Sequence, residues 1–340
     1  MRNVVRRIAV LAAGALAACA VFEVGLRPLY WLPYVHHPRL GSILPAGTVA
    51  RYCREGCGTS RWADDGARHA TPLDPARPAI LAVGDSFTEA LMTDDALVYP
   101  QRLEAGLDGG WQVVNVGRSG ASPADYIALA PLYAERYAPR WTVIQLRADD
   151  LERDAWDPSK THFARRAEGG VEAVEVPPRP SRTSQLLAPL RRRFALVNLA
   201  TLRLREFRAA ASTEPPLFRA TARAPAEGTP AASYPIEAEL EALAAAYGGR
   251  VTFLFLPDFD PHDVATPGAT ELRFTGACLA HAWSCVDLRS AFPQLAARRE
   301  SPYGFPNSTF NTGHMNDAGH AAAAALLHEE IARLRTLALL

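Results

Sequence analysis

Residues 79–86, with the sequence AILAVGDS, decide the fold class of this chain. The first five are apolar without polar alternation, which is typical of a strand covered on both faces in a parallel sheet. Gly84 and Asp85 end the run, and Ser86 follows directly. The stretch therefore predicts a buried strand that presents a hydroxyl group at its carboxyl end.

Further apolar runs follow the same pattern, at residues 113–116, 142–146, 251–256 and, more weakly, 285–288. Helical patterns lie between or after these runs, at residues 97–107, 122–137, 236–247 and 317–337. Strands that alternate with helices predict an α/β fold, here a doubly wound, flavodoxin-like parallel sheet of five strands in a three-layer α/β/α arrangement. Active sites of such sheets lie at the carboxyl ends of the strands.

The composition is that of a globular chain with a large core. The chain has 340 residues, of which 49% are hydrophobic and 21% charged, and its formal net charge is +0. Such a chain has no overall field that would attract nucleic acid, so we expect no nucleic-acid partner.

The N-terminus has the pattern of an export signal or a membrane anchor. Three arginines within the first seven residues precede an apolar run over residues 8–22. A basic flank of this kind stays in the cytoplasm, so the rest of the chain is expected to face the periplasm or the exterior. Residues 1–27 are either an uncleaved signal anchor or a lipoprotein signal, in which Cys19 of the sequence LAAC becomes the lipidated first residue.

The cysteines beyond Cys19 favour disulfides. An even number remains, as suits an oxidising compartment: Cys53, Cys57, Cys278 and Cys285. The pairs Cys53–Cys57 and Cys278–Cys285 are favoured because each closes a short loop. A zinc site is the rival and reduced cysteines are the further alternative, but the spacings fit zinc knuckles poorly. We therefore expect no metal.

Composition and hydrophobic periodicity divide the chain beyond residue 27 into three parts. Residues 28–77 are rich in proline, glycine and aromatic residues, and we expect a juxtamembrane segment and an N-terminal cap there. The α/β domain follows over residues 78–338. Within it, residues from about 154 to 234 break the rhythm of strands and helices, which indicates an insertion or lid with one helix at 184–208.

Polar residues follow three of the expected strands and precede the last helix. Ser86 is the candidate nucleophile, because a helix that begins there points its free N–H groups at the space where an oxyanion would form. The same position also suits a serine that only caps a helix. Gly120, in the sequence NVGRSG, permits close backbone approach and is a second candidate oxyanion donor. His314 lies in the loop before the last helix and is free to reach Ser86.

Together these motifs resemble the SGNH/GDSL hydrolase family, and more closely its bacterial, membrane-tethered members. The matching blocks are GDSFTE at residues 84–89, NVGRSG at 115–120, RADD at 147–150 and NTGH at 311–314. The resemblance covers residues 78–151 and 310–327. It implies the SGNH fold, no cofactor, and a site shared by the four blocks.

The resemblance also implies the role of each residue. Ser86 would be the nucleophile, His314 its base, and the N–H groups of Ser86 and Gly120 donors to the oxyanion. Two positions depart from the family pattern. Asp149 replaces the oxyanion asparagine, and it must be protonated to donate a hydrogen bond. Asn311, or Thr312 if the acid lies two residues before the histidine, replaces the triad acid. An amide or a hydroxyl can orient the imidazole but cannot stabilise its charged form by charge. Asp317 and Asp287 are alternative acids.

Three further side chains are candidates for substrate binding. Arg118 and Arg147 flank two of the blocks and are suited to an anionic group of the substrate, and Asp85 adjoins the nucleophile. Ordinary surface arginines in an Arg-rich chain are the alternative.

The function predicted from these observations is that of a serine esterase or O-acyl transfer enzyme. It would act through an acyl-enzyme on Ser86, on an ester of an envelope carbohydrate, a lipid or a small molecule. The alternative is a catalytically degenerate protein of the same fold that binds a glycan or another envelope partner. A purely structural envelope protein is the third candidate.

Overall fold

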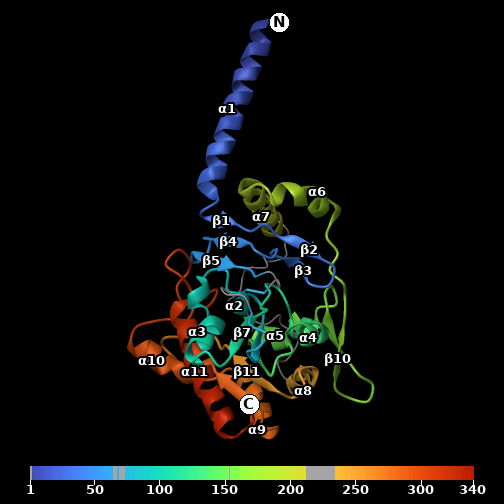
Figure 1. The fold of residues 1–340 in the computed structure, drawn as a ribbon, viewed down its shortest axis with the longest axis vertical. Coiled ribbons are helices and arrows are strands. Elements are labelled where there is room, and N and C mark those ends of the chain that lie inside the picture. The colour runs from blue at the N-terminus through green and yellow to red at the C-terminus, as the bar shows by residue number, and fades with distance from the viewer. Residues whose placement is uncertain (1, 64–66, 69–72, 153, 212–233) are drawn as a thin grey trace.

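The computed structural model describes residues 2–63, 67–68, 73–152, 154–211 and 234–340 of the chain. A long N-terminal helix, α1 (Arg2–Leu26), projects from an α/β body, and the C-terminus lies at the opposite end (Figure 1).

A parallel sheet of five strands forms the centre of the body. Its strands are β6 (Ala79–Val83), β7 (Gln112–Asn115), β8 (Trp141–Leu146), β11 (Val251–Phe255) and β12 (Ser284–Asp287). The order β12-β11-β8-β6-β7, with every neighbouring pair parallel, is the flavodoxin-like order. The predicted doubly wound sheet is therefore confirmed.

Helices cover both faces of this sheet. They are α3 (Tyr99–Gly106), α4 (Pro123–Tyr137), α8 (Ile236–Ala246), α9 (Ala269–Ala280), α10 (Phe292–Ala297) and α11 (Asp317–Thr336). Alternate residues of β6 enter two separate core clusters. Ile80 packs with side chains of α3, α10 and α11, whereas Leu81 packs with side chains of α4, α8 and α9. This alternation produces the three layers, because successive side chains of a strand point to opposite faces.

Short helical turns connect several of these elements. They are α2 (Ser86–Glu89), α5 (Ala148–Glu152) and the 3₁₀ turns η1 (Asp95–Leu97), η2 (Asp154–Trp156) and η4 (Leu288–Ala291). Two of them, α2 and α5, directly follow the carboxyl ends of β6 and β8 and so help to shape the sheet edge where the site lies.

The segment before the sheet forms a cap of small antiparallel sheets. Its strands are β1 (Tyr30–Trp31), β2 (Val35–His37), β3 (Gly41–Ile43), β4 (Val49–Tyr52) and β5 (Gly58–Arg61). The fully buried Arg68 ties the cap to the main domain. Its guanidinium donates to Asp95 at 3.0 Å and to the backbone carbonyl groups of Ala90 and Thr93 at 2.5 and 2.6 Å. The cap is therefore held against the turn that follows α2.

The expected insertion contains a hairpin and two helices in its described part. The elements are β9 (His162–Arg165), β10 (Val171–Val174), α6 (Arg182–Arg191) and α7 (Ala195–Ala211). The single helix expected at 184–208 is therefore wrong: the chain turns between α6 and α7. A carboxylate distant in sequence caps the start of α7, because Glu23 accepts hydrogen bonds from the N–H groups of Ala195 and Leu196. Residues 212–233 lie outside the described part.

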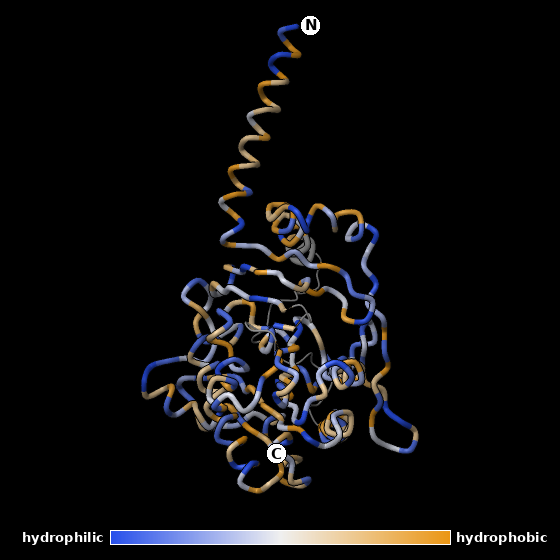
Figure 2. Tube along the Cα trace, viewed as in Figure 1, coloured by the Kyte–Doolittle hydropathy of each residue, from blue (hydrophilic) through white to orange (hydrophobic). Residues whose placement is uncertain are grey.

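Helix α1 has the length and composition of a membrane-spanning helix. Its 25 residues would extend about 37 Å, and none of its most apolar stretch is buried in the protein. Apolar residues dominate its length in Figure 2. An N-terminal signal sequence has the same features.

Both expected disulfides are present. Cys53 pairs with Cys57, and Cys278 pairs with Cys285. Cys19 is free and exposed on α1. The first disulfide closes the loop between β4 and β5, and the second joins the end of α9 to β12.

Candidate active site

Ser86 lies at the carboxyl end of β6, as the first residue of α2. Asp85 caps the helix, since its side chain accepts a hydrogen bond from the N–H group of Phe87 at 2.8 Å. Gly84 allows α2 to pack closely against the end of the strand, because a Cβ atom at this position would lie 2.1 Å from Thr88 Oγ1. The turn leaves the Ser86 side chain partly exposed at the edge of the sheet.

His314 meets Ser86 from the other end of the domain. Its Nε2 atom lies 2.9 Å from Ser86 Oγ, although 228 residues separate the two. The ring packs on Phe87, with 5.0 Å between ring centroids, and the residue is only 7% exposed. A hydroxyl and an imidazole at this distance form the pair that nucleophilic catalysis requires.

The other side of the imidazole contacts Glu55, a residue outside all four sequence motifs. Glu55 Oε2 lies 2.6 Å from His314 Nδ1, and Glu55 Oε1 accepts the backbone N–H group of the same histidine at 2.7 Å. The expectation that Asn311 would orient the imidazole is therefore wrong. Asn311 has a left-handed backbone with φ of 63°, and its buried Oδ1 atom has no hydrogen-bond partner among the described residues.

The contact with His314 also favours the charged form of Glu55. Burial by itself would raise the pKa of this carboxyl group, but the hydrogen bonds and charge of His314 outweigh it, so the pKa lies below its ordinary value. An ionised carboxylate on Nδ1 fixes the tautomer that leaves Nε2 free to take a proton from Ser86.

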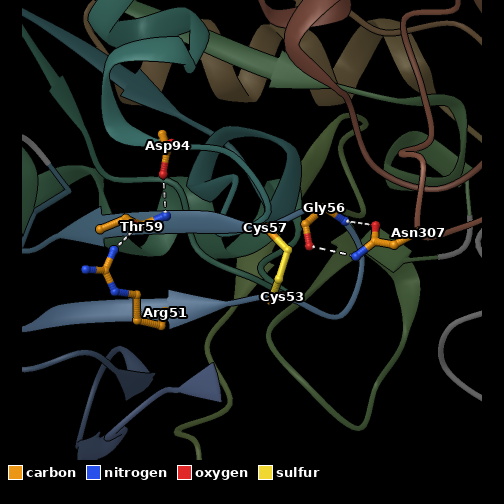
Figure 3. The surroundings of a disulfide bond; sticks show 7 residues. All are labelled: Arg51, Cys53, Gly56, Cys57, Thr59, Asp94 and Asn307. Carbon is orange, nitrogen blue, oxygen red and sulfur yellow. Dashed lines mark hydrogen bonds between the residues drawn. A yellow bond between two sulfur atoms is a disulfide. The ribbon is translucent and has the colours of Figure 1, made fainter. Parts of the chain in front are cut away.

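Glu55 belongs to the disulfide loop of the cap. Figure 3 shows the Cys53–Cys57 bond at the base of this loop and the contact of Gly56 with Asn307 at its tip. Glu55 lies between Cys53 and Cys57, and the neighbouring Gly56 exchanges two hydrogen bonds with the side chain of Asn307, at 2.7 and 3.1 Å. Gly56 has φ of 67°, and a Cβ atom there would lie 2.5 Å from the carbonyl oxygen of Met92. The loop is thus fixed covalently at its base and by hydrogen bonds at its tip.

Gly313 makes room for the carboxylate on the histidine side. Its φ is 88°, and a Cβ atom there would lie 2.1 Å from Glu55 Oε1. Both the backbone conformation and the space require glycine.

The loop that contains Gly120 packs against the Ser86 turn. Asn115 connects the two, since its side chain donates to the carbonyl group of Thr88 at 2.7 Å and accepts from the N–H group of Gly117 at 2.9 Å. Gly120 itself has φ of 78° and is exposed, with open space where a Cβ atom would be. Its N–H group remains a proposed oxyanion donor.

Asp149 does not have the environment that an oxyanion donor needs. Its Oδ1 atom accepts a hydrogen bond from Arg147 Nε at 3.2 Å, and the side chain is 36% exposed. This oxygen is therefore an acceptor in the structure, whereas an oxyanion hole requires donors.

Two neighbouring carboxyl groups have shifted pKa values. Burial raises the pKa of Asp85 to about 6, and the charge of Asp149 adds to the rise. Burial likewise raises the pKa of Asp150, with further contributions from Asp85 and Asp149. Asp85 also caps α2, so in this structure its contacts are those of a structural residue.

The two candidate substrate-binding arginines already have protein partners. Arg118 donates to the carbonyl group of Leu40 at 3.0 Å and lies 3.5 Å from Asp125. Arg147 donates to Asp258 at 3.0 Å, and its guanidinium lies 4.5 Å from the ring centroid of Phe87. Arg147 thus places a positive charge on the ring of Phe87, the residue after the nucleophile, and Asp149 and Asp258 partly compensate this charge.

A cleft of about 630 Å³ adjoins the Gly120 loop. Its lining includes Gly120 and four basic side chains, those of Arg39, Arg118, Lys160 and Arg179. Within the described residues, no group of three or more His, Cys, Asp or Glu side chains is placed to hold a metal ion.

The arrangement agrees with the SGNH/GDSL resemblance: the first three motif blocks follow β6, β7 and β8, and the fourth precedes α11. No family model and no curated protein matches the chain.

Several solved structures are similar to this chain at low identity. TesA has 15% identity and a TM-score of 0.40, with 75% of this chain and 99% of TesA covered. Axe2, an acetylxylan esterase from Geobacillus stearothermophilus, has 14% identity and a TM-score of 0.39, with 75% and 94% covered. A two-domain esterase, CEX, described as active on acetylated mannans, has 13% identity and a TM-score of 0.37; the match covers 76% of this chain and 50% of that esterase. Similarity at this level assigns no activity, so function is argued from the site itself.

Proposed function

We propose that this chain is a serine-dependent ester hydrolase or O-acyl transfer enzyme that forms an acyl-enzyme on Ser86. One observation supports this more than any other. Ser86 Oγ, both ring nitrogens of His314 and the Glu55 carboxylate form a continuous row, with contacts of 2.9 and 2.6 Å. A nucleophile, a base and an acid in this order are the parts of a catalytic triad.

The chemistry follows from this row of contacts. His314 Nε2 takes the proton of Ser86 Oγ as that oxygen attacks the carbonyl carbon of an ester, and the carbonyl oxygen becomes an oxyanion. The imidazolium then gives the proton to the leaving alkoxide, the ester C–O bond breaks, and the acyl group stays on Ser86. Water, or a hydroxyl group of an acceptor, repeats the sequence and removes the acyl group.

Glu55 supplies what Asn311 lacks. A carboxylate on His314 Nδ1 stabilises the imidazolium that forms during each proton transfer, which an amide cannot do by charge. The catalytically degenerate alternative rests on the departures at Asn311 and Asp149. Glu55 removes the first of these reasons, because it provides the carboxylate that Asn311 lacks. We therefore prefer the active enzyme.

The proposed oxyanion hole consists of the backbone N–H groups of Ser86 and Gly120. Asp149 is left out, because it accepts from Arg147. The guanidinium of Arg147 lies over the ring of Phe87, the residue next to the nucleophile, and is 10% exposed. The part of its positive charge that Asp149 and Asp258 leave uncompensated lowers the electrostatic cost of negative charge on a nearby oxyanion.

The non-reacting part of the substrate is proposed to occupy the cleft beside Gly120. Its basic and hydroxyl-bearing lining suits a hydroxyl-rich or anionic glycan better than a long acyl chain. An ester on an envelope carbohydrate is therefore the substrate class we favour.

The proposed location is the outer side of a membrane in which α1 is anchored. Two disulfides support an oxidising compartment, and the basic flank of α1 supports a cytoplasmic N-terminus. The mass of the mature protein distinguishes the two forms of anchor, because a lipoprotein would begin at a lipidated Cys19.

Turnover of p-nitrophenyl acetate by the wild type, Ser86→Ala and Ser290→Ala tests the function. The matched control, Ser290, donates its hydroxyl to the backbone carbonyl of Asp287 and has no role in the proposed mechanism. We expect the first variant to lose turnover and the second to keep it. Equal rates for wild type and Ser86→Ala would reject the proposal.

A further inference from the structure

We propose that residues 181–204, which comprise α6 and the first part of α7, form a second membrane contact that lies on the bilayer surface and binds anionic lipid headgroups. The proposal rests on the anchoring of α1 in the same membrane. It adds a lipid-binding surface to a region that the catalytic proposal does not use.

The first support is the direct connection between this segment and the end of α1. Glu23, in the last turn of α1, accepts hydrogen bonds from the N–H groups of Ala195 and Leu196, each at 2.9 Å. Arg27, just beyond α1, donates to the carbonyl group of Arg193 at 2.6 Å. Helices α6 and α7 accordingly lie beside the base of α1 (Figure 1). A bilayer that contains α1 therefore has its surface at this level.

The second support is an exposed apolar stripe. Leu186, Leu190 and Phe194 are 78%, 45% and 40% exposed and follow one another at intervals of four residues. Side chains at this spacing share one face where the chain is helical. No residue of α6 is buried. A stripe of apolar side chains left 40–78% exposed is typical of a helix that lies in a membrane interface.

Helix α7 has one face that packs against the cap and another that is exposed. Leu199 and Leu202 pack against the cap cluster that contains Tyr30 and Leu32. Leu204 is 48% exposed. One face of α7 thus packs against the cap, and the exposed apolar surface of α7 is the part proposed to contact the bilayer.

The third support is charge. Residues 181–204 contain five arginines and neither aspartate nor glutamate. Three of the arginines are consecutive, at 191–193, where α6 ends and α7 begins. Arginine forms strong hydrogen bonds with phosphate groups, and basic residues beside an apolar stripe bind anionic membranes. Arg27 lies at the same level, where its charge is paired with Glu23 at 2.8 Å. Its guanidinium also stacks on Trp31, 4.6 Å from the ring centroid, and tryptophan is enriched at membrane interfaces.

The test uses the full chain reconstituted in vesicles of phosphatidylethanolamine and phosphatidylglycerol. An environment-sensitive nitrobenzoxadiazole label is attached at Leu186→Cys, or at Leu272→Cys as the control, each in a Cys19→Ser background. Leu272 is also exposed, at 58%, but belongs to α9, which lies at the end of the body away from α1. Lipids brominated in the acyl chains serve as quenchers.

We expect a blue shift and strong quenching at position 186 and neither at position 272. If the label at 186 behaves like the label at 272 in vesicles that retain the protein after alkaline carbonate extraction, the proposal is overturned while the α1 anchor stands. Loss of the protein on extraction would overturn both, because the proposal requires the anchor.

A second variant tests the charge. Arg192→Glu combined with Arg193→Glu should reduce quenching at position 186. In the protein that keeps both arginines, replacing phosphatidylglycerol by phosphatidylcholine should reduce this quenching as well. Turnover of p-nitrophenyl acetate checks that the variant is folded. Quenching that depends on neither change would exclude anionic headgroups, and with them the proposal as stated.

Discussion

Glu55 Oε2 lies 2.6 Å from His314 Nδ1, although 259 residues separate the two side chains in the sequence. The contact joins the N-terminal cap to the loop before α11. The cap therefore contributes a side chain to the candidate active site, and any treatment of the α/β domain alone would leave the imidazole without its carboxylate.

Replacing the carboxylate tests this role directly. Glu55→Gln keeps an oxygen that can accept the Nδ1 proton but loses the charge, so we expect kcat on p-nitrophenyl acetate to fall by about 10²–10⁴-fold. The control is Asn311→Gly, because φ of 63° suits glycine and the substitution removes the side chain first expected in this role. A larger loss of kcat in the control than in Glu55→Gln would contradict the assignment.

Gly313→Ala should disturb the contact between Glu55 and His314, because the added methyl group needs the space that the Glu55 carboxylate occupies. The new Cβ atom would lie 2.1 Å from Glu55 Oε1, so we expect a clear loss of kcat/KM. The matched control is Gly109→Ala, where φ is 72° but nothing lies within 4 Å of the added atom. Both substitutions should cost about 1 kcal/mol of stability from backbone strain. Equal kcat/KM in the two variants would show that the space at Gly313 is unimportant.

The disulfide of the cap should matter for catalysis more than the other disulfide. We expect the double variant Cys53→Ser, Cys57→Ser to lose kcat, because the loop that carries Glu55 is no longer closed at its base. The double variant Cys278→Ser, Cys285→Ser removes a bond of the same kind at α9 and should keep kcat in the folded protein. Turnover of both, measured below their melting temperatures, checks the prediction; an unchanged kcat in the first variant would speak against it.

Glu239 should make stability depend on pH. Burial raises its pKa to about 8, although its hydrogen bond with Trp156 Nε1 at 2.7 Å acts in the opposite direction. The unfolded chain releases this proton near pH 4.5 and the folded chain near pH 8. Folding therefore takes up a proton between these values, and stability falls by about 1.4 kcal/mol per pH unit as the pH rises.

Glu239→Gln removes this dependence and keeps an acceptor for the indole. The free energy of unfolding of the variant should rise relative to the wild type from pH 5 to pH 8, then level off. Urea unfolding at several pH values measures the difference. A constant difference across this range would show that Glu239 is ionised in the folded state.

The central sheet was predictable because its signal is local. Each of the five strands contains or overlaps an apolar run, weakest at β12, and all but β12 are fully buried. Each run is visible without knowing its neighbours. Ser86 and His314 could also be predicted as site residues, since each adjoins a strand or helix that the sequence predicts. The strands of the cap were not, because they span two to four residues with mixed burial and exist only through pairing.

Glu55 was missed for a physical reason. Its partner is determined by how the cap folds onto the domain, and no sequence pattern connects residue 55 with a histidine 259 residues away. One signal was present in the sequence: an acidic residue enclosed by a four-residue cysteine spacing, which a disulfide would hold rigid. The break between α6 and α7 could not be predicted for a similar reason, since Glu23, the carboxylate that caps α7, lies far away in sequence.

The row from Glu55 through His314 is proposed to activate Ser86 as a nucleophile. Labelling with a fluorophosphonate, followed by mass spectrometry of the modified peptide, tests it most directly. The account predicts one adduct, on Ser86, formed rapidly by the wild type and far more slowly by Glu55→Gln. An adduct on another residue, no adduct, or equal labelling rates for the two proteins would contradict it.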